Sequence, residues 1–242
     1  MTTAVITMGG IGKRFLDAGY TIPKYRIVVN GKSLFVWAME SLKAYIDDGS
    51  PFIFIVKKSD NSETFIKEES AMIGIVDVTV VEIDAATDGQ ATTALFAGDC
   101  ISRTDPFFVY NIDTHIRPGS VTAYKGDADG WIPCFAGKGD AWSFVALDKY
   151  GTATEVREKV RISDNATLGL YWFSSYALYD ETYQAYYGNH NGAMPAEKYI
   201  APMYNYLISN GRKVTISTIK NEDVIPLGTP EEVSAVEAVH SC

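Results

Sequence analysis

Apolar runs rich in β-branched and aromatic residues alternate with helical patterns through the first half of the chain. The runs cover residues 4–8, 52–56, 76–83 and 107–110. Apolar residues at spacings of three and four predict helices over residues 33–46, 62–73 and 92–101. Mostly apolar strands separated by helices indicate a mainly parallel sheet that is covered on both faces. We therefore expect an α/β fold, arranged as a three-layer α/β/α sandwich.

In the second half, short strands follow one another without the regular alternation with helices, which predicts a mixed sheet. Its strands are expected at residues 131–136, 143–147, 152–157, 168–173 and 213–219, and its helices at residues 176–187 and 196–210. A last helix is expected to begin at Thr229, where Thr-Pro-Glu-Glu forms a capping box, and residues 60–63 show a similar pattern. No repeat or linker is visible, which favours a single domain over residues 1–242.

The charge balance restricts the partners of such a domain. The 242 residues carry a net charge of −9, so the surface as a whole repels nucleic acid and anionic membranes. We expect no signal peptide, no membrane span and no disulfide framework, which together favour the cytoplasm. A basic cluster in an acidic chain is informative, and one is present near the N-terminus, at Lys13, Arg14, Lys24 and Arg26.

That cluster belongs to a glycine-rich stretch, TMGGIGKRFLDAGYTIPKY, which follows the first predicted strand. Loops of this kind usually bind phosphate, because bare backbone lets N–H groups converge on an anion. Two familiar motifs fail here. The dinucleotide fingerprint would place its third glycine at Phe15, and a P-loop ending at Gly31-Lys32-Ser33 would need its first glycine at Arg26.

The remaining pattern is Gly10-x-Gly12-x-Arg14-Phe15, followed by Pro23-Lys24. It resembles the signature of the sugar-phosphate nucleotidyltransferases, the superfamily of nucleoside-diphosphate-sugar pyrophosphorylases and cytidylyltransferases. The resemblance extends in register along nearly the whole chain, and it implies the Rossmann-like nucleotide-diphospho-sugar transferase fold. It also implies that Arg14 and Lys24 are catalytic and hold the nucleotide phosphates. The nucleotide-binding backbone that it implies comprises Met8, Gly9, Gly10, Gly12 and Lys13.

Two later stretches extend the resemblance to the nucleotide and its metal. Asp88-Gly-Gln-Ala-Thr92 matches a stretch that contacts the base, which implies nucleotide binding by Gly89, Gln90 and Thr92; a plain helix N-terminus is the alternative. Asn111-Ile-Asp113 follows a predicted parallel strand, where ligands of such sheets bind. The resemblance implies that Asp113 coordinates Mg²⁺ and that Asn111 contacts the nucleotide.

The acceptor half of the site is implied by Glu158-Lys159, which closes a predicted hairpin. In the resembled family the lysine binds the acceptor phosphate and the glutamate meets acceptor hydroxyls. Many members carry a second metal-binding aspartate where this chain has Pro226, so either Glu222 or Asp223 substitutes, or one protein carboxylate suffices.

The three histidines show no zinc spacing. We expect His115 to line the site near Asp113, and His190 and His240 to be surface residues.

The expected function is Mg²⁺-dependent transfer of a nucleotidyl group from an NTP to a small phosphorylated acceptor, a sugar 1-phosphate or related alcohol. CTP is preferred, because the compact length resembles that of cytidylyltransferases. The resemblance also suggests capsule or surface-polysaccharide precursors as products, and it is compatible with a homodimer. The alternatives are a nucleotide-sugar-dependent glycosyltransferase of the related fold and a non-catalytic module that binds nucleotide sugar.

Overall fold

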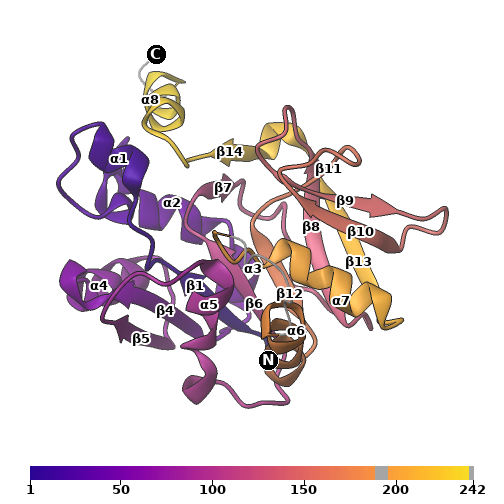
Figure 1. Cartoon of the computed structure of the whole chain (residues 1–242). Coiled ribbons are helices and arrows are strands. Elements are labelled where there is room, and N and C mark those ends of the chain that lie inside the picture. Colours follow the sequence, from indigo (N-terminus) through magenta and orange to yellow (C-terminus); the bar gives the residue numbers. More distant parts are fainter. Residues whose placement is uncertain (189–195, 240–242) are drawn as a thin grey trace.

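The computed structural model describes residues 1–188 and 196–239, and a ten-stranded sheet runs through it (Figure 1). His190 and His240 lie outside the described residues. The strands lie in the order β10 (Ala153–Glu158), β9 (Ser143–Leu147), β11 (Asn165–Thr167), β8 (Gly130–Ala136), β12 (Leu170–Phe173), β6 (Phe107–Asn111), β1 (Thr3–Thr7), β4 (Phe52–Lys57) and β5 (Val78–Ile83), and β13 (Val214–Ile219) pairs with β8.

The N-terminal part of the sheet is parallel, as predicted. Strands β6, β1, β4 and β5 are mutually parallel, whereas β12 runs antiparallel to β6 and introduces the mixed part. The register places Thr7, the last residue of β1, opposite both Asn111 and Ile55. The carboxyl ends of β1 and β6 are therefore level, and the loops that follow them emerge side by side. In sheets of this kind, ligands bind at that edge.

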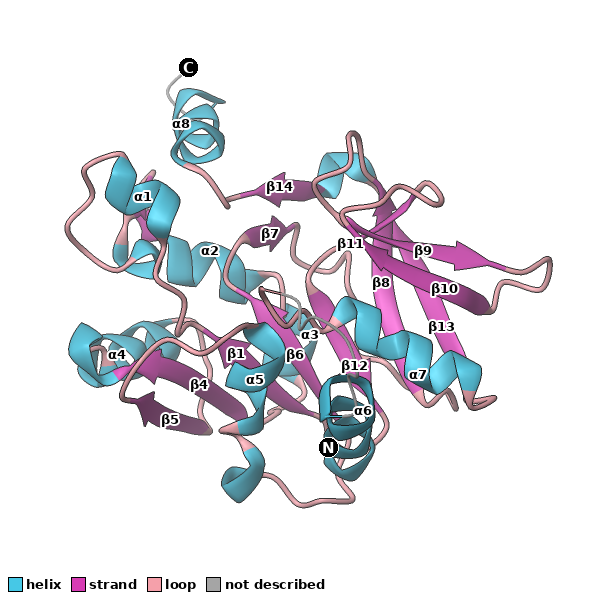
Figure 2. Ribbon diagram, viewed as in Figure 1, coloured by secondary structure: helices cyan, strands magenta, loops and turns pink. Residues whose placement is uncertain are grey.

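Alternate side chains of the strands enter two separate cores, which gives the three layers (Figure 2). Phe52 and Phe54 of β4 face one core, and Ile53 and Ile55 face the other. The first core packs against α2 (Leu34–Glu40), α3 (Lys43–Asp47) and α4 (Glu63–Met72), and the second against α5 (Gln90–Leu95), α6 (Tyr176–Gly188) and α7 (Tyr204–Ser209). The predicted α/β/α sandwich is confirmed.

A third, smaller apolar cluster lies beyond the carboxyl edge of the sheet. It joins α1 (Lys13–Asp17) to the last helix, α8 (Pro230–Val239), through Phe15, Trp37 and Val233 among others. Both helices lie at the same corner of the molecule (Figure 1). Two small two-stranded sheets complete this region, β2 (Val28–Val29) with β3 (Lys32–Ser33), and β7 (Thr114–Ile116) with β14 (Val224–Pro226).

The capping box predicted at Thr229 forms. The Glu232 carboxylate accepts bonds from the N–H groups of Gly228 (2.7 Å) and Thr229 (3.0 Å), and the Thr229 hydroxyl accepts one from Glu232 N–H (3.2 Å). The similar pattern at residues 60–63 does not form a box, because Asp60 closes a 3-10 turn and the Ser62 hydroxyl bonds to Tyr25 Oη at 2.6 Å. The described 3-10 turns are Lys24–Arg26, Lys58–Asp60, Gly98–Cys100, Ala201–Met203 and Asn221–Asp223.

Three predicted helices differ from the observed ones. The helix expected over residues 33–46 is divided at Ser41, whose hydroxyl accepts the N–H of Ile116 at 2.8 Å. The helix expected over 92–101 begins earlier and ends at Leu95. The helix expected over 196–210 is shorter, because the backbone of Lys198 is bonded to the loop before α5 instead of to a following turn. Among the described helices, none has both the length and the apolar character required to cross a bilayer.

Candidate active site

The glycine-rich loop at residues 8–12 follows β1 and leads directly into the five-residue helix α1. Gly12 has a φ of 66°, in the left-handed region that favours glycine. A Cβ on Gly10 would meet no atom within 4 Å, so the backbone at this point borders open space. Met8, at the start of this loop, has a buried side chain, and its N–H bonds to Ile55 O at 2.8 Å. Its amide therefore cannot also donate to a phosphate.

Lys24 lies beside this loop and forms an ion pair with Asp113. Its Cβ is 3.9 Å from the place that a Gly12 Cβ would occupy, and its ammonium lies 5.3 Å from the ring centre of Phe15. The Lys24 side chain is only 10% exposed, whereas that of Asp113 is 50% exposed. The lysine stem is thus held by packing while the carboxylate can reach an incoming ligand.

The other three cations of the N-terminal basic cluster differ in the groups that they contact. Arg14 Nη1 lies 3.9 Å from the place of a Gly228 Cβ, and the neighbouring Leu227 donates its N–H to Asp113 O at 2.7 Å. The segment before α8 therefore brings Arg14 and Asp113 to one corner. Lys13 is highly exposed and pairs with Asp17 one turn along α1, at 3.1 Å. Arg26 is structural, since its guanidinium donates to the carbonyl of Asn61 at 2.6 Å.

The loop at residues 88–91 leads into α5 and is fixed at both ends. Lys198 N–H donates to Asp88 O at 2.8 Å, and Lys198 O accepts from Ala91 N–H at 3.0 Å. Gly89 has a φ of 149°, and a Cβ there would lie 2.4 Å from the backbone N and O of Lys198. Glycine is therefore required here by the protein itself, whatever it contributes to a base.

The side chains of this loop have partners within the protein. Gln90 Nε2 donates to Thr7 Oγ1 at 3.2 Å, which places Gln90 at the carboxyl end of β1. Thr92 bonds to Asp88 and, at 2.8 Å, to Tyr183 Oη, so its hydroxyl lies against α6. The Asp88 carboxylate pairs with Lys198 Nζ at 2.8 Å and raises the pKa of that lysine.

Asn111 ends β6 and packs against Gly169, a residue that the sequence did not single out as functional. The N–H of Asn111 donates to Gly169 O at 3.2 Å, and a Cβ on Gly169 would lie 2.0 Å from Asn111 Oδ1. Gly169 also has a φ of 78°. Its position inside an apolar, strand-like run was the available signal, because such glycines mark close approach of another group. Asn111 Oδ1 is buried and has no hydrogen-bond partner.

Asp113 and Asn111 supply oxygen donors of the kind that Mg²⁺ prefers. The Asp113 carboxylate is half-exposed and already faces one positive charge, the Lys24 ammonium, and Asn111 offers the unpartnered amide oxygen. The residues present therefore fit this ion. Within residues 1–188 and 196–239 no three His, Cys, Asp or Glu side chains are grouped as a metal site. Mg²⁺ commonly completes its coordination with substrate phosphates and water, so a site with one protein carboxylate is chemically sufficient.

The second carboxylate considered at Glu222 or Asp223 is not brought to Asp113. Pro226 is paired with Thr114 in the β7–β14 ribbon, whereas Asp223 lies at the other end of β14. There the Asp223 carboxylate pairs with Arg117 Nε at 3.1 Å and accepts from the Ser120 hydroxyl at 2.9 Å. Glu222 is exposed and lies 3.9 Å from Lys220 Nζ. The geometry favours the single-carboxylate alternative.

Glu158 ends β10 and Lys159 follows it; β10 stands at one end of the strand order, several strands away from β1 and its glycine-rich loop. Glu158 accepts from the Ser143 hydroxyl and lies 3.5 Å from Lys159 Nζ. Lys159 Nζ donates to Tyr199 Oη at 2.7 Å, and this bond raises the pKa of the lysine. A groove of about 1030 Å³ between β10 and α7 is lined by Glu158, Glu197 and Tyr199 among others. Tyr199 and Glu197 were not predicted, because nothing in their local sequence distinguishes them.

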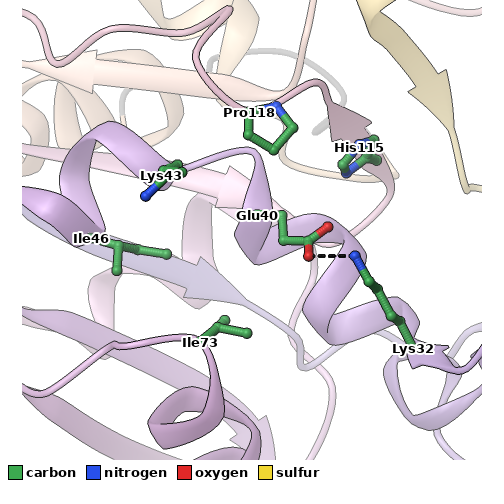
Figure 3. Close-up of a pocket in the computed structure, with 7 residues that line it drawn as sticks. All are labelled: Lys32, Glu40, Lys43, Ile46, Ile73, His115 and Pro118. Atoms are coloured by element: carbon green, nitrogen blue, oxygen red, sulfur yellow. Dashed lines mark hydrogen bonds and ion pairs between the residues drawn. The ribbon is translucent and has the colours of Figure 1, made fainter.

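His115 does not line the site, contrary to the expectation. It lies in β7, is 5% exposed, and its Nδ1 bonds to the carbonyl of Trp37 at 2.5 Å. β7 begins at Thr114, pairs with β14 and packs against α2, so His115 is held against α2 instead of beside Asp113. It lines a separate pocket of about 440 Å³. Figure 3 draws the seven lining residues, His115 with Lys32, Glu40, Lys43, Ile46, Ile73 and Pro118. Lys32 and Glu40 form an ion pair there, at 2.6 Å.

Comparison with solved structures shows similarity in both sequence and fold. The chain aligns with the nucleoside-diphosphate-sugar pyrophosphorylase of Vibrio cholerae RC9 at 32% identity and a TM-score of 0.88, over 98% of this chain and 100% of that one. The inositol-1-phosphate CTP transferase of T. maritima shares the fold at 15% identity and a TM-score of 0.74, over 100% and 98% of the two chains. No protein-family model matches the chain, and no curated protein matches it.

Proposed function

This chain belongs to the nucleoside-diphosphate-sugar pyrophosphorylase family and is a nucleotidyltransferase, and from that premise we propose its substrates and its cofactor. The proposed reaction joins an NTP, preferably CTP, to a sugar 1-phosphate or a related phosphorylated alcohol and releases pyrophosphate. The proposed cofactor is Mg²⁺. We further propose that the reaction takes place in the cytoplasm and supplies precursors of capsule or surface polysaccharide.

The observation that carries this proposal is the meeting of Lys24 and Asp113 beside Gly12, at the level ends of β1 and β6. Bare backbone, a buried-stem cation and a half-exposed acid are the three elements needed to receive a metal-bound triphosphate. The loop after β1 offers N–H groups, and Lys24 offers a positive charge that little solvent screens. Arg14 approaches the same corner from α1.

The reaction needs no general base, because a phosphate monoester is already a nucleophile at neutral pH. An acceptor phosphate oxygen forms a bond to the α-phosphorus, and the bond from that phosphorus to the bridging oxygen breaks, so that pyrophosphate leaves with both electrons. Such transfers depend on positioning and on neutralising charge. In this chain Lys24 and Arg14 would neutralise the triphosphate, and Lys159 would seat the acceptor phosphate.

Mg²⁺, when bound, would neutralise phosphate charge and orient the leaving group. Asp113 would hold it, with Asn111 as a further oxygen donor. Lys24 pairs with one oxygen of Asp113, and the half-exposed carboxylate could turn to the metal while the packed lysine stays beside the phosphates.

Nucleotide choice is tested by thermal shift with CTP, UTP, ATP, GTP and dTTP, each with Mg²⁺. A ligand at 100 times its Kd adds about 2.7 kcal/mol to the free energy of unfolding, and CTP is expected to give the largest rise in Tm. Equal shifts with all five nucleotides would contradict the preference for CTP.

Turnover is tested by measuring pyrophosphate from each NTP with a panel of sugar 1-phosphates and polyol phosphates. Release of pyrophosphate that needs both substrates supports the proposal. A glycosyltransferase would instead release a nucleoside diphosphate from a nucleotide sugar, and a binding module would release neither.

A further inference from the structure

Residues 197–199 lie between the two halves of the proposed site and contact both. The backbone of Lys198 is bonded on both sides to the loop at residues 88–91, and its ammonium pairs with Asp88. The next residue, Tyr199, contacts Lys159, the proposed acceptor lysine. One short segment therefore joins the nucleotide loop to the lysine at the end of β10.

The Tyr199 hydroxyl is fully committed in this arrangement. It donates its proton to the Glu197 carboxylate and accepts a bond from Lys159 Nζ at 2.7 Å. The ammonium also lies 4.6 Å from the centre of the Tyr199 ring. Because the phenolic O–H points to Glu197, the lone pairs of the Tyr199 oxygen face Lys159. Glu197 thus orients the Tyr199 hydroxyl, and that hydroxyl orients the Lys159 ammonium.

Glu158 competes with Tyr199 for the Lys159 ammonium. It lies 3.5 Å from Lys159 Nζ, beyond hydrogen-bond reach for a strong contact, and its other oxygen accepts from Ser143. The backbone of Lys159 has a φ of 53°, which is uncommon for a non-glycine residue and fixes where its side chain starts. Without the Tyr199 hydroxyl, the ammonium keeps its ion pair with Glu158 and the more distant charge of Glu197.

The hydroxyl is not what holds Tyr199 in place. Tyr187 Oη donates to Tyr199 O at 2.6 Å, and the segment is fixed again at Lys198. Removing the Tyr199 oxygen should therefore leave the backbone and the ring where they are. Its direct effect would be confined to the two partners of the hydroxyl, Lys159 and Glu197.

We propose that Tyr199 is a positioning residue for the acceptor: its hydroxyl, oriented by Glu197, holds the Lys159 ammonium away from Glu158 and available to the phosphate dianion of the acceptor. This inference rests on the proposed function, since it deepens the role given there to Lys159. The recognised group would be a phosphate, and the Glu158 oxygen that does not accept from Ser143 would meet acceptor hydroxyls at the groove beside β10.

The first test compares wild type with Tyr199→Phe in steady-state assays of pyrophosphate release. We expect the KM for the acceptor phosphate to rise about 10- to 100-fold, the range for one hydrogen bond to a charged group, while the KM for the NTP stays within about twofold. Tyr206→Phe is the matched control, because it also removes a tyrosine–glutamate bond (Tyr206 to Glu181, 3.1 Å) but lies outside the site. An unchanged acceptor KM in Tyr199→Phe overturns the proposal.

The second test needs no turnover. The acylation rate of Lys159 by an amine-reactive reagent is measured by mass spectrometry, with Lys43 as the internal reference. A lysine that loses its bond to Tyr199 should be acylated several-fold faster in Tyr199→Phe. An equal rate overturns the positioning role even if the enzyme is active. A second outcome separates this inference from the proposed function. If Lys159 is acylated faster in Tyr199→Phe but the wild type releases no pyrophosphate from any substrate pair, the proposed function is wrong. Tyr199 would then position Lys159 without any role in binding an acceptor.

Discussion

Lys24 Nζ and Asp113 Oδ1 form an ion pair across 89 positions of sequence, at the edge of the sheet where β1 and β6 end. The pair is asymmetric: the lysine side chain is 10% exposed and the carboxylate 50% exposed. A cation whose stem is packed against Phe15 cannot move far, whereas the acid can turn to a new partner. The free protein therefore keeps both charges satisfied in the positions where a triphosphate and its metal would need them.

Replacing Lys24 by Ala is expected to lower the rate of pyrophosphate release by about 10² to 10³, as loss of one preorganised donor at a reacting centre does. Lys43→Ala is the matched control, because Lys43 also pairs with a carboxylate (Asp47, 2.7 Å) but lies on α3. A Lys24→Ala enzyme with near wild-type kcat would show that this lysine has no part in the chemistry.

Replacing Asp113 by Asn is expected to raise the Mg²⁺ concentration needed for half-maximal activity by at least about tenfold, since an amide binds a hard cation less strongly than a carboxylate. The measurement is a Mg²⁺ titration of initial rates after chelation with EDTA, which is itself expected to abolish activity. If the variant shows the wild-type Mg²⁺ dependence, the metal lies elsewhere.

Gly10 and Gly89 should respond to alanine in opposite ways. A Cβ on Gly10 meets nothing, so Gly10→Ala should change the free energy of unfolding by less than about 0.5 kcal/mol yet weaken NTP binding about tenfold or more. A Cβ on Gly89 meets the Lys198 backbone at 2.4 Å, so Gly89→Ala should cost about 1–3 kcal/mol of stability. Urea unfolding and NTP titration of both variants check this. A wild-type NTP affinity in Gly10→Ala would show that phosphate does not bind beside Gly10.

Stability should rise as the pH rises towards about 6.5 because of His115. Burial lowers the pKa of His115 below its ordinary value, so in this window the unfolded chain binds a proton that the folded protein does not. Protonation therefore favours unfolding as the pH falls below about 6.5, the ordinary histidine value. His115→Asn keeps a donor for Trp37 O and should flatten this dependence, as followed by Tm at pH 5 and 7.5. Parallel pH profiles for the two proteins would exclude His115 as the cause.

Local patterns in the sequence predicted most of the frame on which the site is built. The apolar run at residues 52–56 predicted a strand of the parallel core, because its alternate residues Phe52 and Ile53 are buried on opposite faces of the sheet. Thr229 and Glu232 specified their own cap, since a capping box lies within one helical turn. The resemblance of the glycine-rich loop identified the family before any contact was known.

Tertiary structure alone decided which groups meet. His115 is only two residues from Asp113 but bonds to Trp37 O, because β7 pairs with β14 and packs against α2. Tyr199 is 40 residues from Lys159 and contacts it, through a loop whose backbone closes on Gly89. Hydrogen-bond partners that lie far apart in the chain produce no periodic pattern in its sequence. The physical reason is that periodicity reports burial along one element, whereas a site is formed by the ends of several.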